Sequence, residues 1–161
     1  MKKVYFAGGC FWCIASVFDG LDGVIKVVSG YSGGDEVNPT YMEVKKQLTN
    51  HREAIEITLD EEKISYEKIL DLFLDSVDPF DDGGQFIDRG HSYTLAIFYN
   101  DDEEKELALK KIKAIEEKEN KEVKISVEKF KSFYDAEEEH QDYAKKNPEA
   151  FEKELIESGR K

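Results

Sequence analysis

The segment Ala54–Leu59 alternates strictly between inward and outward side chains, and this pattern constrains the possible folds most strongly. Ile55, Ile57 and Leu59 fall on one face of an extended strand. A period of two is typical of a strand buried on one side only. The chain therefore contains a β-sheet with a second layer packed against it.

Strand-like and helix-like segments interleave along the rest of the chain. Four more segments are predicted strands: Val4–Ala7, Val24–Tyr31, Tyr93–Tyr99 and Val123–Glu128. Five segments are predicted helices: Cys10–Phe18, Thr40–Leu48, Ser65–Asp75, Asp101–Glu119 and the C-terminal part, where Pro148 follows Asn147 at a helix start. Because the order is not a clean repeat, the sequence predicts an α+β fold, a mixed sheet with helices packed on it in a sandwich.

Local signals place several helix starts and one long loop. Thr40 and Glu43 form a capping-box pattern, and Ser65 is a suitable N-cap. The acidic runs Asp101–Glu104 and Glu137–Glu139 lie where helices begin, where negative charge complements the helix dipole. The segment 77–92 has no periodicity, and a loop of this length in a compact domain is usually functional or disordered.

Composition narrows the class of protein. The 161 residues suit a single domain, residues 1–161, and 40% hydrophobic content is that of a globular protein. The net charge of −13 argues against nucleic acid and anionic membranes as partners. No apolar run approaches the ~20 residues of a membrane span, and the N-terminus lacks a signal-peptide core. We therefore expect a cytoplasmic protein.

Cys10 and Cys13 are the only cysteines, and four chemistries are open to such a pair. A structural disulfide between them would close almost no loop and would stabilise little. A zinc site needs four ligands, and the three histidines are far apart in sequence. The pair could also be a redox couple, or a nucleophile with a helper. We therefore expect no metal and a reactive thiol.

The position of Cys10 favours reactivity. It follows a strand and the pair Gly8-Gly9, which allows a tight turn, and it opens a helix whose amide groups lower a thiol pKa. Cys13 lies one turn further on the same face, a spacing compatible with a reversible disulfide. A thioredoxin-like or glutaredoxin-like dithiol–disulfide reductase is the alternative. The Phe-Trp pair between the cysteines and the absence of a suitable later proline speak against it.

The run "GGCFWC" at Gly8–Cys13 resembles the signature of the A-type peptide methionine sulfoxide reductases. Further segments resemble the family in the same order: "GYSGG" at Gly30–Gly34, "NPTYMEV" at Asn38–Val44, the His51/Glu53 pair, "DP" at Asp78-Pro79, the spacing from Asp88 to Tyr93, and "HQDYAKKNP" at His140–Pro148. The resemblance covers nearly the whole chain. It implies reduction of methionine-S-sulfoxide, free or in proteins, by a two-layer α+β sandwich related to the ferredoxin-like fold.

The resemblance also implies roles for individual residues. Cys10 is the nucleophile that becomes a sulfenic acid, and Glu53 is the acid. Substrate contacts are implied for two groups of residues: Tyr41, Tyr93 and Asp88 at the sulfoxide oxygen, and Phe11 and Trp12 at the methyl group. The resemblance implies no prosthetic cofactor. An external thiol reductant such as thioredoxin or glutaredoxin is expected, and the protein is expected to be a monomer.

The pattern of the Ala54–Leu59 strand supports the role of Glu53. Glu53 immediately precedes this strand with the parity of Ile55 and Ile57, so its carboxyl group points inward. Burial raises a carboxyl pKa and keeps the acid protonated near neutral pH. His51 and His140 are expected to serve structural hydrogen bonds.

The chain departs from the family in three places. Cys13 stands where many relatives have glycine, and the tail "LIESGRK" has no cysteine. Either Cys13 or an outside thiol therefore resolves the sulfenic acid. The segment before Tyr93 is less polar than usual, and Thr94 replaces an arginine. Asn50 and Arg52 replace small residues beside His51.

Overall fold

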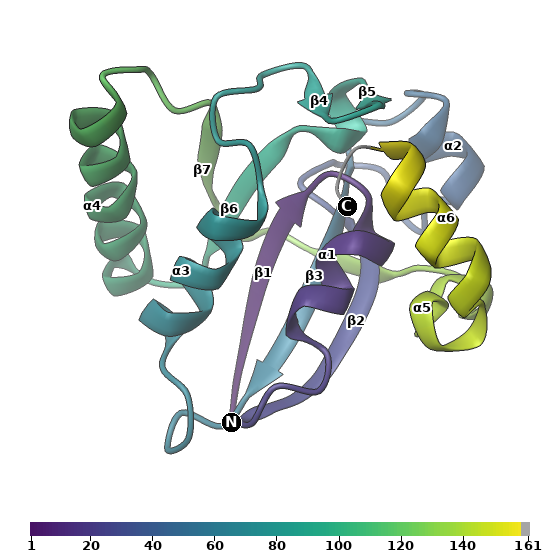
Figure 1. Ribbon diagram of the computed structural model, residues 1–161, viewed down its shortest axis with the longest axis horizontal. Coiled ribbons are helices and arrows are strands. Elements are labelled where there is room, and N and C mark those ends of the chain that lie inside the picture. The colour runs from purple at the N-terminus through teal and green to yellow at the C-terminus, as the bar shows by residue number, and fades with distance from the viewer. Residues whose placement is uncertain (159–161) are drawn as a thin grey trace.

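The chain folds around a six-stranded mixed β-sheet with helices packed on one face (Figure 1). The computed structural model describes residues 1–158. The sheet order is β7-β6-β1-β3-β2-β8, and within residues 1–158 only the β6–β7 pair is parallel. The strands are β1 (Lys2–Gly8), β2 (Val24–Ser32), β3 (Arg52–Leu59), β6 (Leu95–Tyr99), β7 (Ile125–Lys129) and β8 (Phe133–Asp135). The predicted α+β class with a mixed sheet is confirmed.

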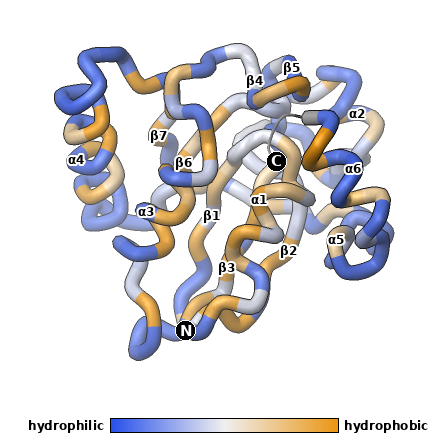
Figure 2. Tube along the Cα trace, viewed as in Figure 1, coloured by the Kyte–Doolittle hydropathy of each residue, from blue (hydrophilic) through white to orange (hydrophobic). Residues whose placement is uncertain are grey.

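Three helices form the second layer: α1 (Phe11–Phe18), α3 (Tyr66–Ser76) and α4 (Asp102–Glu119). Their buried faces share one core with the inward residues of β1, β3 and β6. Ile55, Ile57 and Leu59 are fully buried in this core, as their alternation predicts. Figure 2 shows hydrophobic residues concentrated along the strands and α1, whereas hydrophilic residues predominate on α4.

The opposite face of the sheet is covered by chain rather than by helices. Tyr5 and Phe98 form a small second cluster there with two more phenylalanines. Phe130 lies between β7 and β8, and Phe133 is the first residue of β8. The ring centroids of Tyr5 and Phe130 are 3.9 Å apart and stacked. This cluster fixes the segment that leads into the C-terminal helices.

Antiparallel pairing brings three chain segments to one edge of the sheet. Phe6 of β1 pairs with Ile55 of β3, so the end of β1 lies beside the start of β3. Gly8 pairs with Leu95, which puts the start of β6 at the same edge. This is the upper edge in Figure 1, where α2 (Tyr41–Lys45), β4 and β5 also lie.

Several predicted boundaries were wrong. Tyr93 belongs to a short 3-10 helix, η1 (His91–Tyr93), and β6 begins only at Leu95. The predicted helix over Thr40–Leu48 is only the five-residue α2, because the chain turns at Gln47 with a positive φ. The strand β8 was missed, since three residues at a sheet edge carry no periodic signal.

The segment 77–92 is more ordered than the predicted loop. It contains a small hairpin of β4 (Gly84–Gln85) and β5 (Asp88–Arg89), followed by η1. Gln85 is fully buried and bonds to the backbone of Asp78 in both directions, at 2.8 and 2.9 Å. Arg89 forms a forked ion pair with Asp81. These side-chain hydrogen bonds order a segment whose sequence has neither helix nor strand periodicity.

The predicted helix starts are confirmed. Thr40 forms a complete capping box with Glu43, and Ser65 accepts from Lys68 N–H. Asp101 caps α4, and Pro148 is the first residue of α6 (Pro148–Ser158), which follows α5 (Tyr143–Lys146).

The acidic runs do more than complement helix dipoles. Glu104 is buried and pairs with Lys2 at 2.9 Å, which ties α4 to β1. Glu137 precedes a three-residue 3-10 helix, η2 (Glu138–His140), and its carboxylate accepts hydrogen bonds from distant segments. The other residues of the two runs, Asp101–Glu103 and Glu137–Glu139, are exposed.

Close approach of β8 requires glycine at position 30. A Cβ atom on Gly30 would collide with the Phe133 ring and the carbonyl oxygen of Tyr134. We expect Gly30→Ala to lower the free energy of unfolding by about 1–3 kcal/mol, the usual cost of overpacking. Chemical denaturation measures this, with the exposed Lys26→Ala on the same strand as the control. Equal stability of the two variants would contradict the packing of β8 on β2.

Candidate active site

Cys10 lies at the junction between β1 and α1. Gly9 has φ +88°, which favours glycine, and a Cβ atom on Gly8 would lie 2.8 Å from the Ile14 side chain. The predicted tight turn is therefore confirmed. Cys10 is the N-cap of α1, and only 5% of it is exposed.

Glu53 is the second residue of β3, on the helix-covered face, and is 1% exposed. Its Oε1 accepts a hydrogen bond from Phe11 N–H at 3.2 Å, which joins the start of α1 to a residue 42 positions away. Its Oε2 is also buried, and the Tyr93 hydroxyl lies within hydrogen-bonding reach of the carboxyl group. The inward orientation predicted for Glu53 is confirmed.

The carboxyl group of Glu53 is an acid at neutral pH. Burial is the main effect on its pKa, which is raised to about 8. The hydrogen bond from Phe11 N–H lowers the Glu53 pKa, and the charge of Asp88 raises it. At pH 7 the protonated form therefore predominates. A buried proton donor lies beside the start of α1.

The expected lowering of the Cys10 pKa was wrong. The hydrogen bond with Cys13, burial and the neighbouring Glu53 together raise the pKa of the Cys10 thiol well above its ordinary value. The first amide group of the helix, Phe11 N–H, donates to Glu53. One helix amide does serve the sulfur, since a backbone hydrogen bond from Cys13 lowers the Cys10 pKa, but the raising effects outweigh it.

Cys13 is the immediate neighbour of Cys10. Both cysteines are reduced and buried, and the Cys13 side chain lies within hydrogen-bonding reach of Cys10. Cys13 N–H also donates to the Cys10 carbonyl oxygen at 3.2 Å. The two sulfurs are thus held together on the first turn of α1.

Aromatic side chains surround the cysteines. Phe11 is buried, Trp12 is partly buried, and the Tyr41 ring stacks on both, with centroids 6.1 and 6.3 Å away. Tyr143 stacks on Trp12 at 3.9 Å. Trp12 therefore packs directly on the two cysteines, whereas Phe11 belongs to the main core, and the apolar wall expected of this pair stays a prediction.

Tyr93 is held on both sides by hydrogen bonds from other elements. Gln47 accepts from Ser92 N–H at 3.0 Å and donates to Ser92 Oγ at 2.8 Å. Arg52 Nε donates to Thr94 Oγ1 at 2.8 Å. The residues on either side of Tyr93 are therefore tied to the end of α2 and to β3.

Glu137 fixes the position of Tyr41. Its carboxylate accepts from Tyr31 O–H at 2.8 Å and from Tyr41 N–H at 3.1 Å. Burial raises the pKa of the Tyr41 and Tyr93 hydroxyls, and the charges of Glu53 and nearby groups raise it further. Both tyrosines therefore keep their O–H donors across the physiological range.

Asp88, on β5, belongs to the same electrostatic group. Its charge raises the pKa values of Glu53, Tyr41 and Tyr93. The structure thus brings Cys10, Cys13 and the other predicted residues to one place at the sheet edge.

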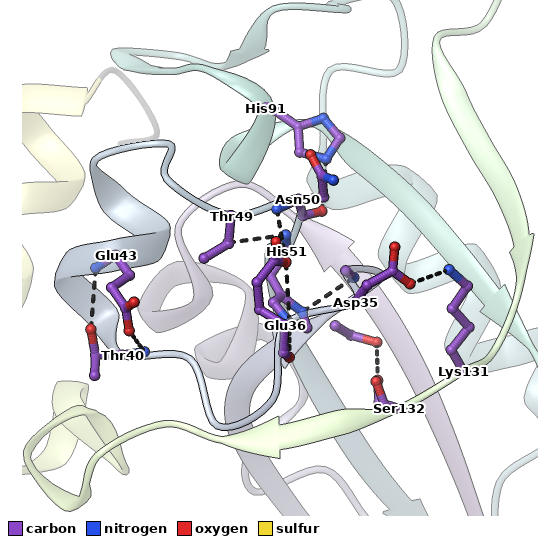
Figure 3. A network of polar contacts seen from close by, with 12 residues as sticks. Asp35, Glu36, Thr40, Glu43, Thr49, Asn50, His51, His91, Lys131 and Ser132 are labelled. Atoms are coloured by element: carbon purple, nitrogen blue, oxygen red, sulfur yellow. Dashed lines mark hydrogen bonds and ion pairs between the residues drawn. The ribbon is translucent and has the colours of Figure 1, made fainter.

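The two histidines have different surroundings. His51 is fully buried; its Nδ1 accepts from Gly34 N–H at 3.2 Å, and its Nε2 lies 2.7 Å from the Glu36 carbonyl oxygen. Figure 3 shows His51 at the centre of the network around Glu36, Thr49 and Asn50. His51 therefore holds the loop after β2, the structural role that we expected.

His140 accepts a hydrogen bond from Trp12 Nε1 at 3.2 Å through Nδ1. Its Nε2 lies in a group with Glu137 and Glu139 whose potential ligand atoms are within 4.8 Å of one another. Because Nδ1 accepts, the ring proton of neutral His140 sits on Nε2, and that nitrogen has no lone pair for a metal. This group therefore does not point to a metal site.

Sequence reasoning missed the residues that support this site. Gln47, Glu137 and Ser92 carry no motif, and their roles depend on contacts between distant segments. Phe151, on α6, packs against Cys10 and Cys13 and was also missed. In the sequence, the one sign of this contact is an apolar residue in a predicted C-terminal helix.

The sequence and the fold of this chain are both similar to those of known proteins. Residues 2–161 match the family model described as peptide methionine sulfoxide reductase.

The chain belongs to this family. It is 48% identical over 157 residues to the peptide methionine sulfoxide reductase MsrA of Bacillus licheniformis, covering 96% of this chain and 87% of the relative. A protein of the same name from Listeria monocytogenes strain HCC23 is 46% identical, with coverage of 99% and 92%. The chain is thus an oxidoreductase that reduces methionine sulfoxide.

Solved structures agree with this fold. Reduced Mxr1 of Saccharomyces cerevisiae is similar with a TM-score of 0.85 and 29% identity, covering 92% of this chain and 86% of that one. Methionine sulfoxide reductase A of Corynebacterium diphtheriae gives a TM-score of 0.83 at 25% identity, with 91% and 75% coverage. Among residues 1–158 of this reductase, no helix is long and apolar enough to cross a bilayer.

Burial of Glu53 should reduce stability at neutral pH. Its folded pKa of about 8 exceeds the ordinary 4.5, so the unfolded chain releases the proton first, and stability falls as pH rises between these values. We expect Glu53→Gln to be more stable than the parent protein at pH 7, by about 3 kcal/mol at 1.36 kcal/mol per pKa unit.

Denaturation of both proteins between pH 4.5 and 8 measures this effect. The difference should shrink toward pH 4.5, where the folded parent protein is protonated and the unfolded chain is about half protonated. Glu56→Gln is the matched control, since Glu56 lies on the same strand and accepts from Tyr5 O–H at 3.0 Å. A difference for Glu53→Gln that does not vary with pH would contradict the raised pKa.

Proposed function

We propose that this reductase converts methionine-S-sulfoxide, free or in proteins, to methionine through a sulfenic acid on Cys10. The observation that carries the proposal is the Glu53 carboxyl group beside Cys10, which is 1% exposed, accepts from Phe11 N–H and has a pKa that burial raises to about 8. A sulfoxide oxygen that gains negative charge needs such an acid. Cys10 supplies the nucleophile next to it.

The proposed reaction balances without an outside proton. Cys10 Sγ bonds to the sulfoxide sulfur while Glu53 protonates the oxygen, and Glu53 then takes up the thiol proton. The hydroxyl group passes to Cys10, the bond between the two sulfurs breaks, and methionine leaves. Cys10 is oxidised by two electrons, and the substrate is reduced by two. The raised pKa values of Cys10 and Glu53 support this scheme because both protons are present at the start.

The neighbouring residues are proposed to orient the substrate. Tyr41 and Tyr93 donate O–H bonds to the sulfoxide oxygen without adding charge. Asp88 helps to keep Glu53 protonated, since its charge raises the Glu53 pKa. Phe11 and Trp12 contact the methyl group. The residues that contact the sulfoxide oxygen are thus different from those that contact the methyl group. This difference supports a preference for one sulfoxide epimer.

Cys13 is proposed to resolve the sulfenic acid. Its thiol condenses with Cys10–SOH, forming a disulfide and releasing water. The hydrogen-bonding reach between the two side chains supports this role. An external dithiol then reduces the disulfide by exchange and becomes oxidised itself.

We propose thioredoxin or glutaredoxin as that reductant. A structure has been solved of Saccharomyces cerevisiae Mxr1 in complex with Trx2, and the similar chain in it is 21% identical to this one. That complex is a precedent for a thioredoxin as the partner of another protein of this fold. We propose further that the protein works as a cytoplasmic monomer without a prosthetic group.

Thiol counting separates the two ways of resolving Cys10. Pre-reduced protein, freed of reductant, is mixed with one methionine sulfoxide epimer, and methionine and remaining thiols are quantified. We expect methionine from the S epimer only, one mole per mole of protein, with both thiols lost. Loss of one thiol would instead assign resolution to an outside thiol.

Two variants complete this experiment. Cys10→Ser should form no methionine, and Cys13→Ser should still form one equivalent while keeping the sulfenic acid. Failure of Cys13→Ser in a single turnover would contradict the assignment of Cys10 as the sole nucleophile.

The activity should depend on the proton of Glu53. We expect kcat/KM to fall as pH rises through about 8, because deprotonated Glu53 cannot protonate the oxygen. Glu53→Gln should lower kcat/KM by roughly 100-fold or more, whereas Glu56→Gln should change it little. Disulfide exchange assayed in the same samples should be nearly unchanged by Glu53→Gln.

An equal loss of disulfide exchange and sulfoxide reduction in Glu53→Gln would count against the proposed role. A parent protein that exchanges disulfides but forms no methionine would favour the dithiol–disulfide reductase alternative.

A further inference from the structure

The C-terminal helix α6 covers the thiol that has to react. Phe151 forms a buried cluster with Cys10 and Cys13, and Leu155, one turn later, packs against it. Phe151 is 9% exposed and Cys10 is 5% exposed. A side chain of this chain thus occupies space beside the reactive sulfur.

The same cluster includes the aromatic wall. Trp12 and Tyr143 pack on the cluster formed by Phe151 and the two cysteines. Phe151 therefore uses part of the apolar surface, at Trp12 and Cys10, that the proposed function gives to the substrate. A sulfoxide with a methyl group on one side and a longer chain on the other cannot reach a thiol buried to this extent while Phe151 stays in place.

The anchor of the C-terminal segment lies before α6. Tyr143 of α5 stacks on Trp12 at 3.9 Å, and Lys145 pairs with Asp19 at 3.0 Å. On α6 itself, Ile156 is 59% exposed and takes no part in the cluster. Displacement of Phe151 therefore does not require the Tyr143–Trp12 stack or the Lys145–Asp19 ion pair to break.

We infer that Phe151 is a specificity-determining residue, an internal competitor that must leave the apolar surface at Cys10 and Trp12 before a sulfoxide reaches the sulfur. This inference rests on the proposed function. When only a fraction of molecules is open, the apparent affinity for substrate is reduced by that fraction. Phe151 therefore sets KM and the accessibility of Cys10, and leaves the chemistry at Glu53 unchanged.

The test compares Phe151→Ala with Ile156→Ala, a matched truncation on the exposed side of the same helix. Alkylation of Cys10 by iodoacetamide is followed by mass spectrometry in a Cys13→Ser background, so that one thiol reports. KM and kcat for the sulfoxide are measured with Cys13 present and an external dithiol. We expect Phe151→Ala to speed alkylation and lower KM, each by about tenfold, with kcat nearly unchanged.

A merely structural role for Phe151 predicts the opposite sign for KM and kcat. Loss of packing would disorder the site, raise KM and lower kcat. Unchanged alkylation and KM in Phe151→Ala would also overturn the inference, as would equal effects of Ile156→Ala. If the thermal unfolding transition of Phe151→Ala is lost, Phe151→Leu decides, because it keeps an apolar side chain and should give a smaller change in the same direction.

The alkylation rate does not depend on sulfoxide chemistry. A parent protein that forms no methionine, together with faster alkylation in Phe151→Ala, would overturn the proposed function and leave the covering role of Phe151 standing. Methionine formation with no response of alkylation or KM to Phe151→Ala would overturn the covering role alone.

Discussion

The hydrogen bond from Phe11 N–H to Glu53 Oε1 is the contact on which the arrangement of the site depends. It spans 3.2 Å and joins the first turn of α1 to the first residues of β3. It also uses the first amide donor of the helix for a carboxyl group. Burial then raises the pKa of Glu53, and the proximity of Glu53 and Cys13 raises that of Cys10. Acid and nucleophile are therefore both protonated before substrate arrives.

The sheet makes this contact possible. Because β1 runs antiparallel to both β3 and β6, the end of β1 meets the starts of its two neighbours at one edge. Side chains outside the reaction then fix the remaining groups: Gln47 holds the residue before Tyr93, and Glu137 holds the backbone of Tyr41. The site is thus supported by ordinary neutral and charged hydrogen bonds between segments that are distant in sequence.

Sequence patterns predicted the parts of this architecture that depend on local chemistry. The period of β3 gave the inward face of Glu53, and the Thr40 capping box and the glycines before Cys10 were confirmed. The patterns failed where distant contacts decide. The three-residue strand β8 exists because Gly30 allows close pairing, and the Cys10 pKa depends on a carboxyl group from another strand. No local pattern signals the covering contact of Phe151.

The central claim is that Glu53 carries a proton at neutral pH. The most direct measurement is the 13C chemical shift of the Glu53 side-chain carboxyl carbon as a function of pH, with Glu53→Gln to assign the signal. We expect a titration midpoint near 8. A midpoint near the ordinary value of 4.5 would mean that Glu53 is a carboxylate at neutral pH, and it could not then be the proton donor.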